Sequence, residues 1–143
     1  MQVKEVMTAH VEVVAPDVTV KQAAEKMKVL DIGPLPVCDG DQMVGMLTDR
    51  DIIVRVVAEG RDPTTTKVRD AMTPEVVYCF EDQDASEAAR LMQERQIRRL
   101  PVLSRDKRLV GIVSLGDLAV ETSDTQRAGE ALKGVSEPAQ PKR

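Results

Sequence analysis

The pattern of apolar and polar positions predicts the same series of elements in each half of the chain. Short runs rich in β-branched and aromatic residues, at 11–15 and 76–80, predict a first strand. A stretch with helical periodicity follows each run. After it, "LPVCD" with "MVGMLT", and "LPVLS" with "LVGIVS", predict a two-stranded hairpin before a second helix. The order strand, helix, strand, strand, helix indicates an α/β unit whose small sheet is covered by helices.

The first helix of each half has a start signal and one apolar face. Thr19 with Gln22, and Asp84 with Glu87, have the spacing of helix-start boxes. The residues expected on the buried faces are Val20, Ala23, Ala24, Met27 and Leu30 in the first half, and Ala85, Ala88, Ala89 and Met92 in the second. The alanine pairs allow these helices to pack closely on the sheet.

The second helix of each half, expected over 49–59 and 115–122, begins after a hydroxyl residue that is followed three places later by an aspartate. Such a pair can satisfy the free backbone N–H groups at a helix start. The same hydroxyl and carboxylate could instead hold a ligand at the junction between strand and helix. The two pairs are Thr48 with Asp51, and Ser114 with Asp117.

The two halves are copies of one unit. At an offset of 65 positions, "VKEVMT" aligns with "VRDAMT", "KQAAEKM" with "SEAARLM", and "IGPLPV" with "IRRLPV"; after one inserted residue, "VGMLTDRDI" aligns with "VGIVSLGDL". Shared secondary structure alone would not keep these dipeptides and tripeptides in register, so the chain contains an internal repeat. We divide it into repeat 1 at 1–60, a connector at 61–67, repeat 2 at 68–121 and a polar, partly disordered tail at 122–143, where a short helix around 126–132 is weakly indicated.

Composition narrows the classes of function. Aromatic residues make up 1% of the chain and the net charge is −4, which argues against nucleic-acid binding by base stacking or by a basic surface. Cys38 and Cys79 have no metal-site spacing, so buried free thiols are expected, with a disulfide between them as the alternative. No apolar run approaches the roughly 18 residues of a membrane span. We expect a cytoplasmic protein without a membrane partner.

The repeated motifs resemble those of the CBS-domain family. The motif "MT", an "LPV" strand, and an ending in which Gly, two apolar residues and Ser or Thr precede an Asp each occur twice, over about residues 1–120. Together they look like a CBS-domain pair, or Bateman module. "DIGPLPVCD" and "GMLTDRDI" are further similar to stand-alone bacterial CBS-domain proteins of the hypoxic-response type. The resemblance implies a tandem of βαββα repeats packed with pseudo-twofold symmetry through their sheets, clefts between the repeats, and a homodimer of modules.

The resemblance also implies ligands that contain adenosine: AMP, ADP or ATP, with NAD or S-adenosylmethionine as alternatives. In the family, the aspartate holds the ribose hydroxyls and the Ser or Thr contacts phosphate or ribose. If the opposite copy completes each cleft, cleft 1 consists of Thr48, Arg50, Asp51, Val76, Val77, Ile97, Arg98 and Arg99. Cleft 2 then consists of Val11, Glu12, Ile32, Gly33, Pro34, Ser114, Gly116 and Asp117. Because only cleft 1 contains arginines, which match phosphate oxygens, we expect it to be the stronger nucleotide site.

The leading hypothesis is a non-enzymatic regulatory module that binds adenine nucleotides and signals to an unidentified effector protein by a conformational change. The alternatives are a structural or interaction module with vestigial clefts, and a redox sensor that uses Cys38 and Cys79. A catalytic role is not expected, because His10 is the single histidine and neither a nucleophile–His–acid set nor a phosphate-binding glycine loop is present. We expect no catalytic cofactor and no metal.

Overall fold

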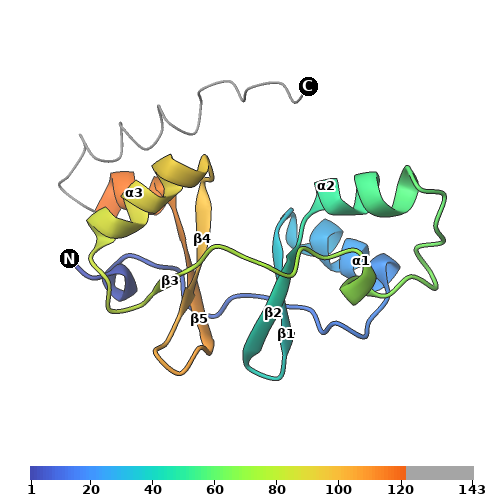
Figure 1. The fold of residues 1–143 in the computed structure, drawn as a ribbon, viewed down its shortest axis with the longest axis horizontal. Helices are drawn as coiled ribbons and strands as arrows, with labels where there is room; N and C mark the ends of the chain where they lie inside the picture. Colours follow the sequence, from blue (N-terminus) through green and yellow to red (C-terminus); the bar gives the residue numbers. More distant parts are fainter. Residues whose placement is uncertain (122–143) are drawn as a thin grey trace. The chain divides into compact units, whose positions relative to one another are not determined.

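The computed structural model describes residues 1–121, which belong to two compact units. The predicted tail at 122–143, with the short helix around 126–132, lies outside the described residues. Each unit combines helices with a small sheet, as the α/β prediction requires (Figure 1). We name the units by the sequence copy that supplies their sheet. The first-copy unit contains Glu12–Val76 and Lys107–Leu109; the second-copy unit contains Met1–Val11, Val77–Asp106 and the described residues from Val110 onward.

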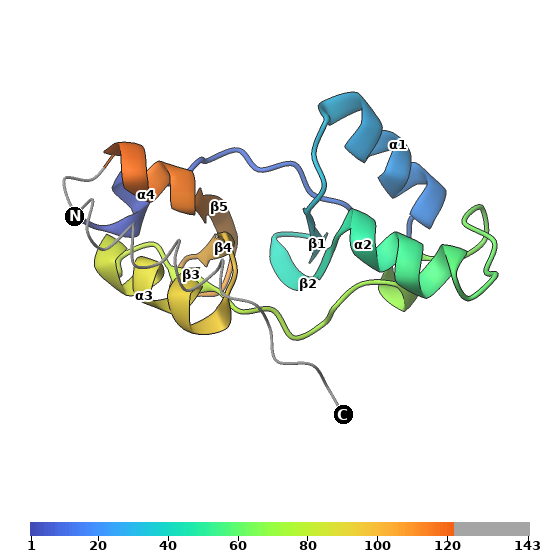
Figure 2. The same cartoon turned by 90° about the horizontal axis from the view of Figure 1, so that it is seen from above.

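In the first-copy unit, two helices lie on the same side of a β-hairpin (Figures 1 and 2). The elements are α1 (Val20–Leu30), β1 (Leu35–Asp39), β2 (Gln42–Leu47) and α2 (Asp49–Ile52). The hairpin is antiparallel, with Leu35 opposite Leu47, so its first and last residues meet at one end. The strand expected at 11–15 is reduced to a single parallel bridge between Val14 and Val37.

The second-copy unit repeats this arrangement with a three-stranded sheet. Its elements are β3 (Cys79–Phe80), α3 (Ala85–Arg95), β4 (Arg99–Leu103), β5 (Leu109–Ser114) and α4 (Leu115–Glu121). The strand order is β3-β4-β5, and β3 runs parallel to β4 with Cys79 opposite Val102. Figure 2 shows α3 and α4 together on one side of these strands.

Each unit is completed by a short helical turn that lies at the start of the other copy in the sequence. The turn η1 (Val3–Glu5) supplies Val3 to the core of the second-copy unit, and η3 (Val68–Asp70) supplies Val68 to the core of the first-copy unit. Both valines are fully buried. The boundaries of the sequence repeats therefore differ from those of the compact units at the start of each copy.

Backbone hydrogen bonds hold the "MT" dipeptides that follow these turns. Thr8 and Ile112 exchange two bonds of 2.8 and 2.9 Å, and Thr73 and Met46 do the same at 2.8 and 2.9 Å. Because each dipeptide adds to the edge of a hairpin, the register of the two matching motifs is fixed by main-chain pairing.

Both first helices begin where the start signals place them, but only one of the two predicted boxes forms. Thr19 accepts a hydrogen bond from the Gln22 backbone N–H, and the Gln22 side chain accepts one from the Thr19 N–H, so the predicted box forms. Asp84 caps α3 through the Ser86 N–H, while Glu87 bonds to the Gln83 side chain instead of closing a box.

The predicted buried faces are correct with two exceptions. Val20, Ala23 and Met27 are buried in α1, as are the four predicted residues of α3. Ala24 is half-buried, and Leu30 at the end of α1 is exposed. The spacing predicts Leu30 on the buried face, but the helix ends at this residue and Asp31 adopts a left-handed conformation.

The second helix of the first-copy unit differs from its predicted form. α2 covers only Asp49–Ile52 and continues as the π-helical segment η2 (Ile53–Val57), in which each N–H reaches one residue further back than in an α-helix. Gly60 follows with a positive φ of 68°, which suits the predicted stop. None of the helices among residues 1–121 is both long and apolar enough to span a membrane.

Candidate functional site

The junction between β2 and α2 presents a hydroxyl and a carboxylate that bind each other's backbone. Thr48 Oγ1 accepts a hydrogen bond from the Asp51 N–H at 3.1 Å, and Asp51 Oδ2 accepts one from the Thr48 N–H at 3.0 Å. This is the capping box that the spacing allows, so the structural interpretation of the pair is correct. The box uses Oδ2 of Asp51, and Oδ1 takes no part in it.

The junction between β5 and α4 has the same geometry. Ser114 Oγ accepts from the Asp117 N–H at 3.0 Å, and Asp117 Oδ2 accepts from the Ser114 N–H at 2.9 Å. Both groups are partly exposed. Capping and ligand binding are compatible at such a junction, because a carboxylate has about four acceptor positions and the box uses one.

The two junctions differ in what surrounds the second carboxylate oxygen. Asp51 Oδ1 lies 3.9 Å from Nη2 of Arg55, whose Nη1 also donates to the carbonyl oxygens of Ala71 and Met72 at 2.9 Å each. Among the described residues, no ion pair reaches Asp117. Sequence reasoning missed Arg55, although its position four residues after Asp51 on a predicted helix indicates a contact between the two side chains.

The loop before each hairpin lies beside the junction of its own copy. The Leu115 N–H donates to the Arg98 carbonyl oxygen at 2.8 Å. In the other unit, a Cβ placed on Gly33 would lie 3.2 Å from Oδ1 of Asp49, the first residue of α2. The residues 97–99 therefore adjoin Ser114, and the residues 32–34 adjoin Thr48.

These contacts lie within each unit, and the crosswise grouping that defines the two expected clefts stays a prediction. The physical reason for the contacts is the antiparallel hairpin: Leu35 pairs with Leu47, so the residue before β1 and the residue after β2 meet at the same end. The hairpin was predicted from the sequence, and its pairing was the signal that could have assigned Gly33 to the Thr48 junction and Arg98 to the Ser114 junction. Binding of a ligand by these residues stays a prediction.

The remaining predicted cleft residues have separate environments. Glu12 forms an ion pair with Lys26 at 3.1 Å, and the Lys26 ammonium also donates to the Val13 carbonyl oxygen at 2.6 Å. Val77 and Ile97 pack against the core of the second-copy unit. Val11 and Val76 are the last residues before the chain passes from one unit to the other. Six of the predicted cleft residues are exposed: Glu12, Ile32, Arg50, Arg98, Arg99 and Gly116.

Both cysteines are free and buried, as expected, and each lies in a different unit. Burial raises the pKa of the Cys79 thiol to about 12. Burial, followed by the nearby charge of Asp41, also raises the pKa of Cys38. Reactive thiols need the opposite environment, an electropositive one that lowers the pKa. These surroundings argue against the redox-sensor alternative.

Metal-binding side chains are not clustered in the described part of the chain. No group of three or more His, Cys, Asp or Glu residues there is arranged to hold a metal ion. His10 adopts a positive φ of 56° in the segment that follows the first "MT" motif.

The chain belongs to the CBS domain family: the family model matches residues 3–58 and 68–123. The two matches correspond to the two copies found by the internal alignment, so the chain is a tandem CBS pair.

Similar proteins agree with this assignment. CBS domain-containing protein YhcV of Bacillus subtilis is 43% identical over 134 residues, 94% of each chain. The crystal structure of Hypoxic Response Protein I with two coordinated zinc ions is 38% identical, with a TM-score of 0.78 over 85% of this chain and 99% of that one. The structure of CBSX2 in complex with AMP is 30% identical, with a TM-score of 0.74 over 87% of this chain and 98% of that one. The resemblance to stand-alone CBS pairs of the hypoxic-response type is confirmed.

Proposed function

We propose that this protein is a non-enzymatic regulatory module that binds an adenosine-containing ligand at its strand-to-helix junctions. The observation that carries the proposal is the pair of matching capping boxes, in which each aspartate uses Oδ2 for the backbone. The second oxygen can accept from the two neighbouring hydroxyls of a ribose, and hydrogen bonds to a charged acceptor contribute roughly 1.5–3 kcal/mol each. The complex of the related CBSX2 with AMP supports this ligand class.

The Ser114 junction is the stronger site in this proposal, which reverses the order expected from the crosswise clefts. Arg98, the last loop residue, and Arg99, the first residue of β4, adjoin Ser114, where their side chains can meet phosphate oxygens. At the Thr48 junction the corresponding positions are Gly33 and Pro34. Asp51 also has Arg55 next to its second oxygen, so a ribose must compete with an existing partner.

Ligand binding would regulate the protein through the helix that begins at each junction. A ligand shifts an equilibrium only by its differential affinity for two states. At each junction the aspartate that would bind ribose also caps a helix. Ligand binding can therefore shift the conformation at the start of that helix. We propose that an effector protein senses this change. The location in the cytoplasm stays a prediction.

The decisive experiment is a thermal-shift panel of AMP, ADP, ATP, NAD and S-adenosylmethionine, followed by titration calorimetry. A ligand at about 100 times its dissociation constant stabilises the folded state by about 2.7 kcal/mol, a shift of several degrees. Asp117→Asn keeps an oxygen for the cap but removes the charge, so we expect affinity to fall about tenfold or more. Asp51→Asn is expected to cost less.

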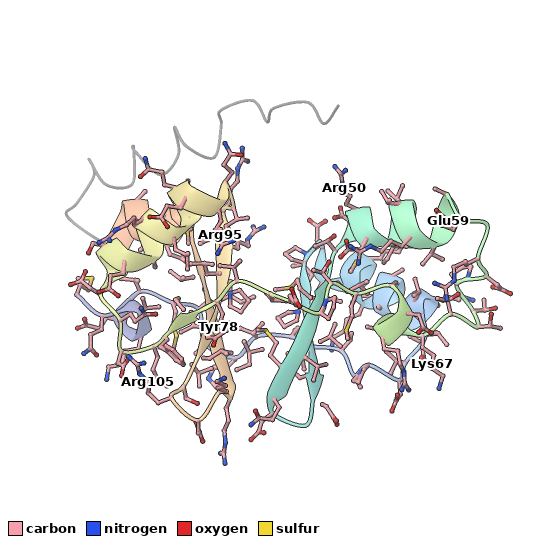
Figure 3. All side chains as sticks on the ribbon, in the orientation of Figure 1. Arg50, Glu59, Lys67, Tyr78, Arg95 and Arg105 are labelled. Carbon is pink, nitrogen blue, oxygen red and sulfur yellow. The ribbon has the colours of Figure 1, made fainter. Side chains whose placement is uncertain are left out.

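Control variants separate phosphate recognition from net charge. Arg98→Gln should weaken ATP more than adenosine. Arg105→Gln removes an equal charge beyond the far end of β4 and should leave affinity unchanged. In Figure 3, Arg105 lies at the opposite end of the second-copy unit from Arg95, the last residue of α3. If no adenosine compound shifts the melting temperature, the structural-module alternative is favoured. Equal losses in Asp51→Asn and Asp117→Asn would contradict the ranking of the two sites.

A further inference from the structure

One arginine of the first-copy unit contacts two segments that are distant from each other in the sequence. Arg55 lies in the π-helical segment η2, and π-helical turns frequently occur at functional sites. Its Nη1 donates to the carbonyl oxygens of Ala71 and Met72 at 2.9 Å each, and its Nη2 lies 3.9 Å from Oδ1 of Asp51. The guanidinium therefore bridges the carboxylate of the Thr48 junction and the residues that follow the turn η3.

The two carbonyl oxygens belong to the segment by which the chain leaves the first-copy unit. Met72 and Thr73 form the second "MT" dipeptide, shortly before the chain passes to the second-copy unit at Val77. The Met72 N–H donates to the carbonyl oxygen of Val68 at 2.9 Å. The Thr73 N–H donates to that of Met46 in β2 at 2.8 Å. The exchange rates of these two amides therefore report how firmly the segment is held.

The contact between Asp51 and Arg55 uses the oxygen that the capping box does not use. Oδ2 of Asp51 accepts from the Thr48 N–H, and Oδ1 faces the guanidinium. The Asp51 side chain is 15% exposed and that of Arg55 42%. A ribose hydroxyl at Oδ1 would compete with Arg55 for this oxygen. A guanidinium that loses its carboxylate partner is held less firmly, so its bonds to the two carbonyl oxygens weaken as well.

The second copy does not have this arginine. The position that aligns with Arg55 is Glu121, and an ionised carboxylate cannot donate to a carbonyl oxygen. The "MT" dipeptide of the second-copy unit nevertheless has matching backbone bonds, because the N–H groups of Met7 and Thr8 donate to carbonyl oxygens at 3.0 and 2.8 Å. The two units therefore offer equivalent amides for comparison, with an arginine at the junction of only one.

We propose that Arg55 couples the Thr48 junction to the segment at Ala71 and Met72. While Oδ1 of Asp51 faces the guanidinium, Arg55 holds the two carbonyl oxygens in place. When a ligand hydroxyl occupies Oδ1, this hold weakens, and binding is transmitted to the segment by which the chain leaves the first-copy unit. The ligand step rests on the proposed function, whereas the coupling of Asp51 to Arg55 does not.

Amide hydrogen exchange of the full-length chain, followed by NMR without ligand, tests the coupling. Asp51→Asn keeps an oxygen for the cap but removes the charge. Exchange of the Met72 and Thr73 amides should therefore rise about two- to fivefold, the range expected for an ion pair between partly exposed groups. Arg55→Gln should raise it about tenfold, because the two bonds from the guanidinium are lost. The double variant should match Arg55→Gln, since Asp51 acts through Arg55. Unchanged exchange in Asp51→Asn, or additive effects in the double variant, would overturn the proposal.

The second copy supplies the matched control for the loss of the cap. Asp117→Asn alters the same capping box, but no ion pair reaches Asp117 among the described residues. Exchange of the Met7 and Thr8 amides should therefore stay at the wild-type rate. A rise as large as the one in Asp51→Asn would show that the weakened cap is the cause, and the role of Arg55 would be refuted.

AMP at saturating concentration tests the ligand step. In the wild type it should raise exchange of the Met72 and Thr73 amides as Asp51→Asn does, and in Arg55→Gln it should have no further effect. Chemical-shift changes at Thr48 and Asp51 show whether AMP occupies this junction. Occupancy without a change in exchange refutes the ligand step. If AMP does not bind there, the proposed ligand site is refuted, and the ligand-free variants decide the coupling on their own.

Discussion

Replacement of Gly45 by alanine should destabilise the first-copy unit strongly, because β2 leaves no room for a side chain at this position. A Cβ there would lie 2.7 Å from Sδ of Met72 and 2.8 Å from the carbonyl oxygen of Thr73. The methionine can adjust its rotamer. The carbonyl cannot, because the Thr73 backbone is bonded to Met46 in both directions.

The size of the effect follows from the two ways in which the strain can be relieved. Forcing an extra methyl group into a packed site costs about 1–3 kcal/mol. Displacing the "MT" segment instead sacrifices two backbone hydrogen bonds, each with a net contribution of about 0.5–1.5 kcal/mol. We therefore expect Gly45→Ala to lower the free energy of unfolding by about 1–3 kcal/mol.

Urea unfolding followed by circular dichroism measures this loss, and the repeat supplies an internal check. Gly111 meets the same obstacles, Met7 Sδ at 2.6 Å and the Thr8 carbonyl oxygen at 2.8 Å, so Gly111→Ala should cost a similar amount. Gly116→Ala is the control, because its nearest atom is Ser114 Oγ at 3.6 Å and alanine favours helix. A Gly45→Ala protein within about 0.5 kcal/mol of the wild type would refute the steric argument.

Three further predictions concern buried and bridging groups. Cys38 and Cys79 should resist thiol reagents at pH 8 in the folded protein and react fully in urea; rapid labelling of the native state would contradict their burial. Because the pKa of Cys79 rises from 9.0 to about 12 on folding, only the unfolded state ionises between these values. Stability should fall as pH rises from 9 towards 12, by up to about 1.4 kcal/mol per pH unit, and Cys79→Ala should weaken this dependence. Arg55→Met, which removes two bonds to the carbonyl oxygens of Ala71 and Met72, should cost about 1–2 kcal/mol in urea unfolding, and an unchanged midpoint would show that these bonds contribute nothing.

The sequence by itself determined the elements whose signals are local. The register of the two copies, the cap at Thr19 and the buried alanines of α3 all follow from the spacing of a few neighbouring residues. The same spacing predicted that Thr48 and Asp51 start a helix, and a capping box forms there. Family membership also followed from the sequence, because the motifs recur in register.

Tertiary structure decided which copies of these motifs lie together. Val3 of η1 is buried in the second-copy unit and Val68 of η3 in the first-copy unit, an exchange that no local pattern encodes. The pairing of β1 with β2 assigned Gly33 to the Thr48 junction, and the Leu115 bond assigned Arg98 to Ser114. Helical periodicity placed Leu30 in the core, and the end of α1 left it exposed. Spacing along the chain fixes which residues share a face, whereas the partner of that face depends on contacts between residues distant in sequence.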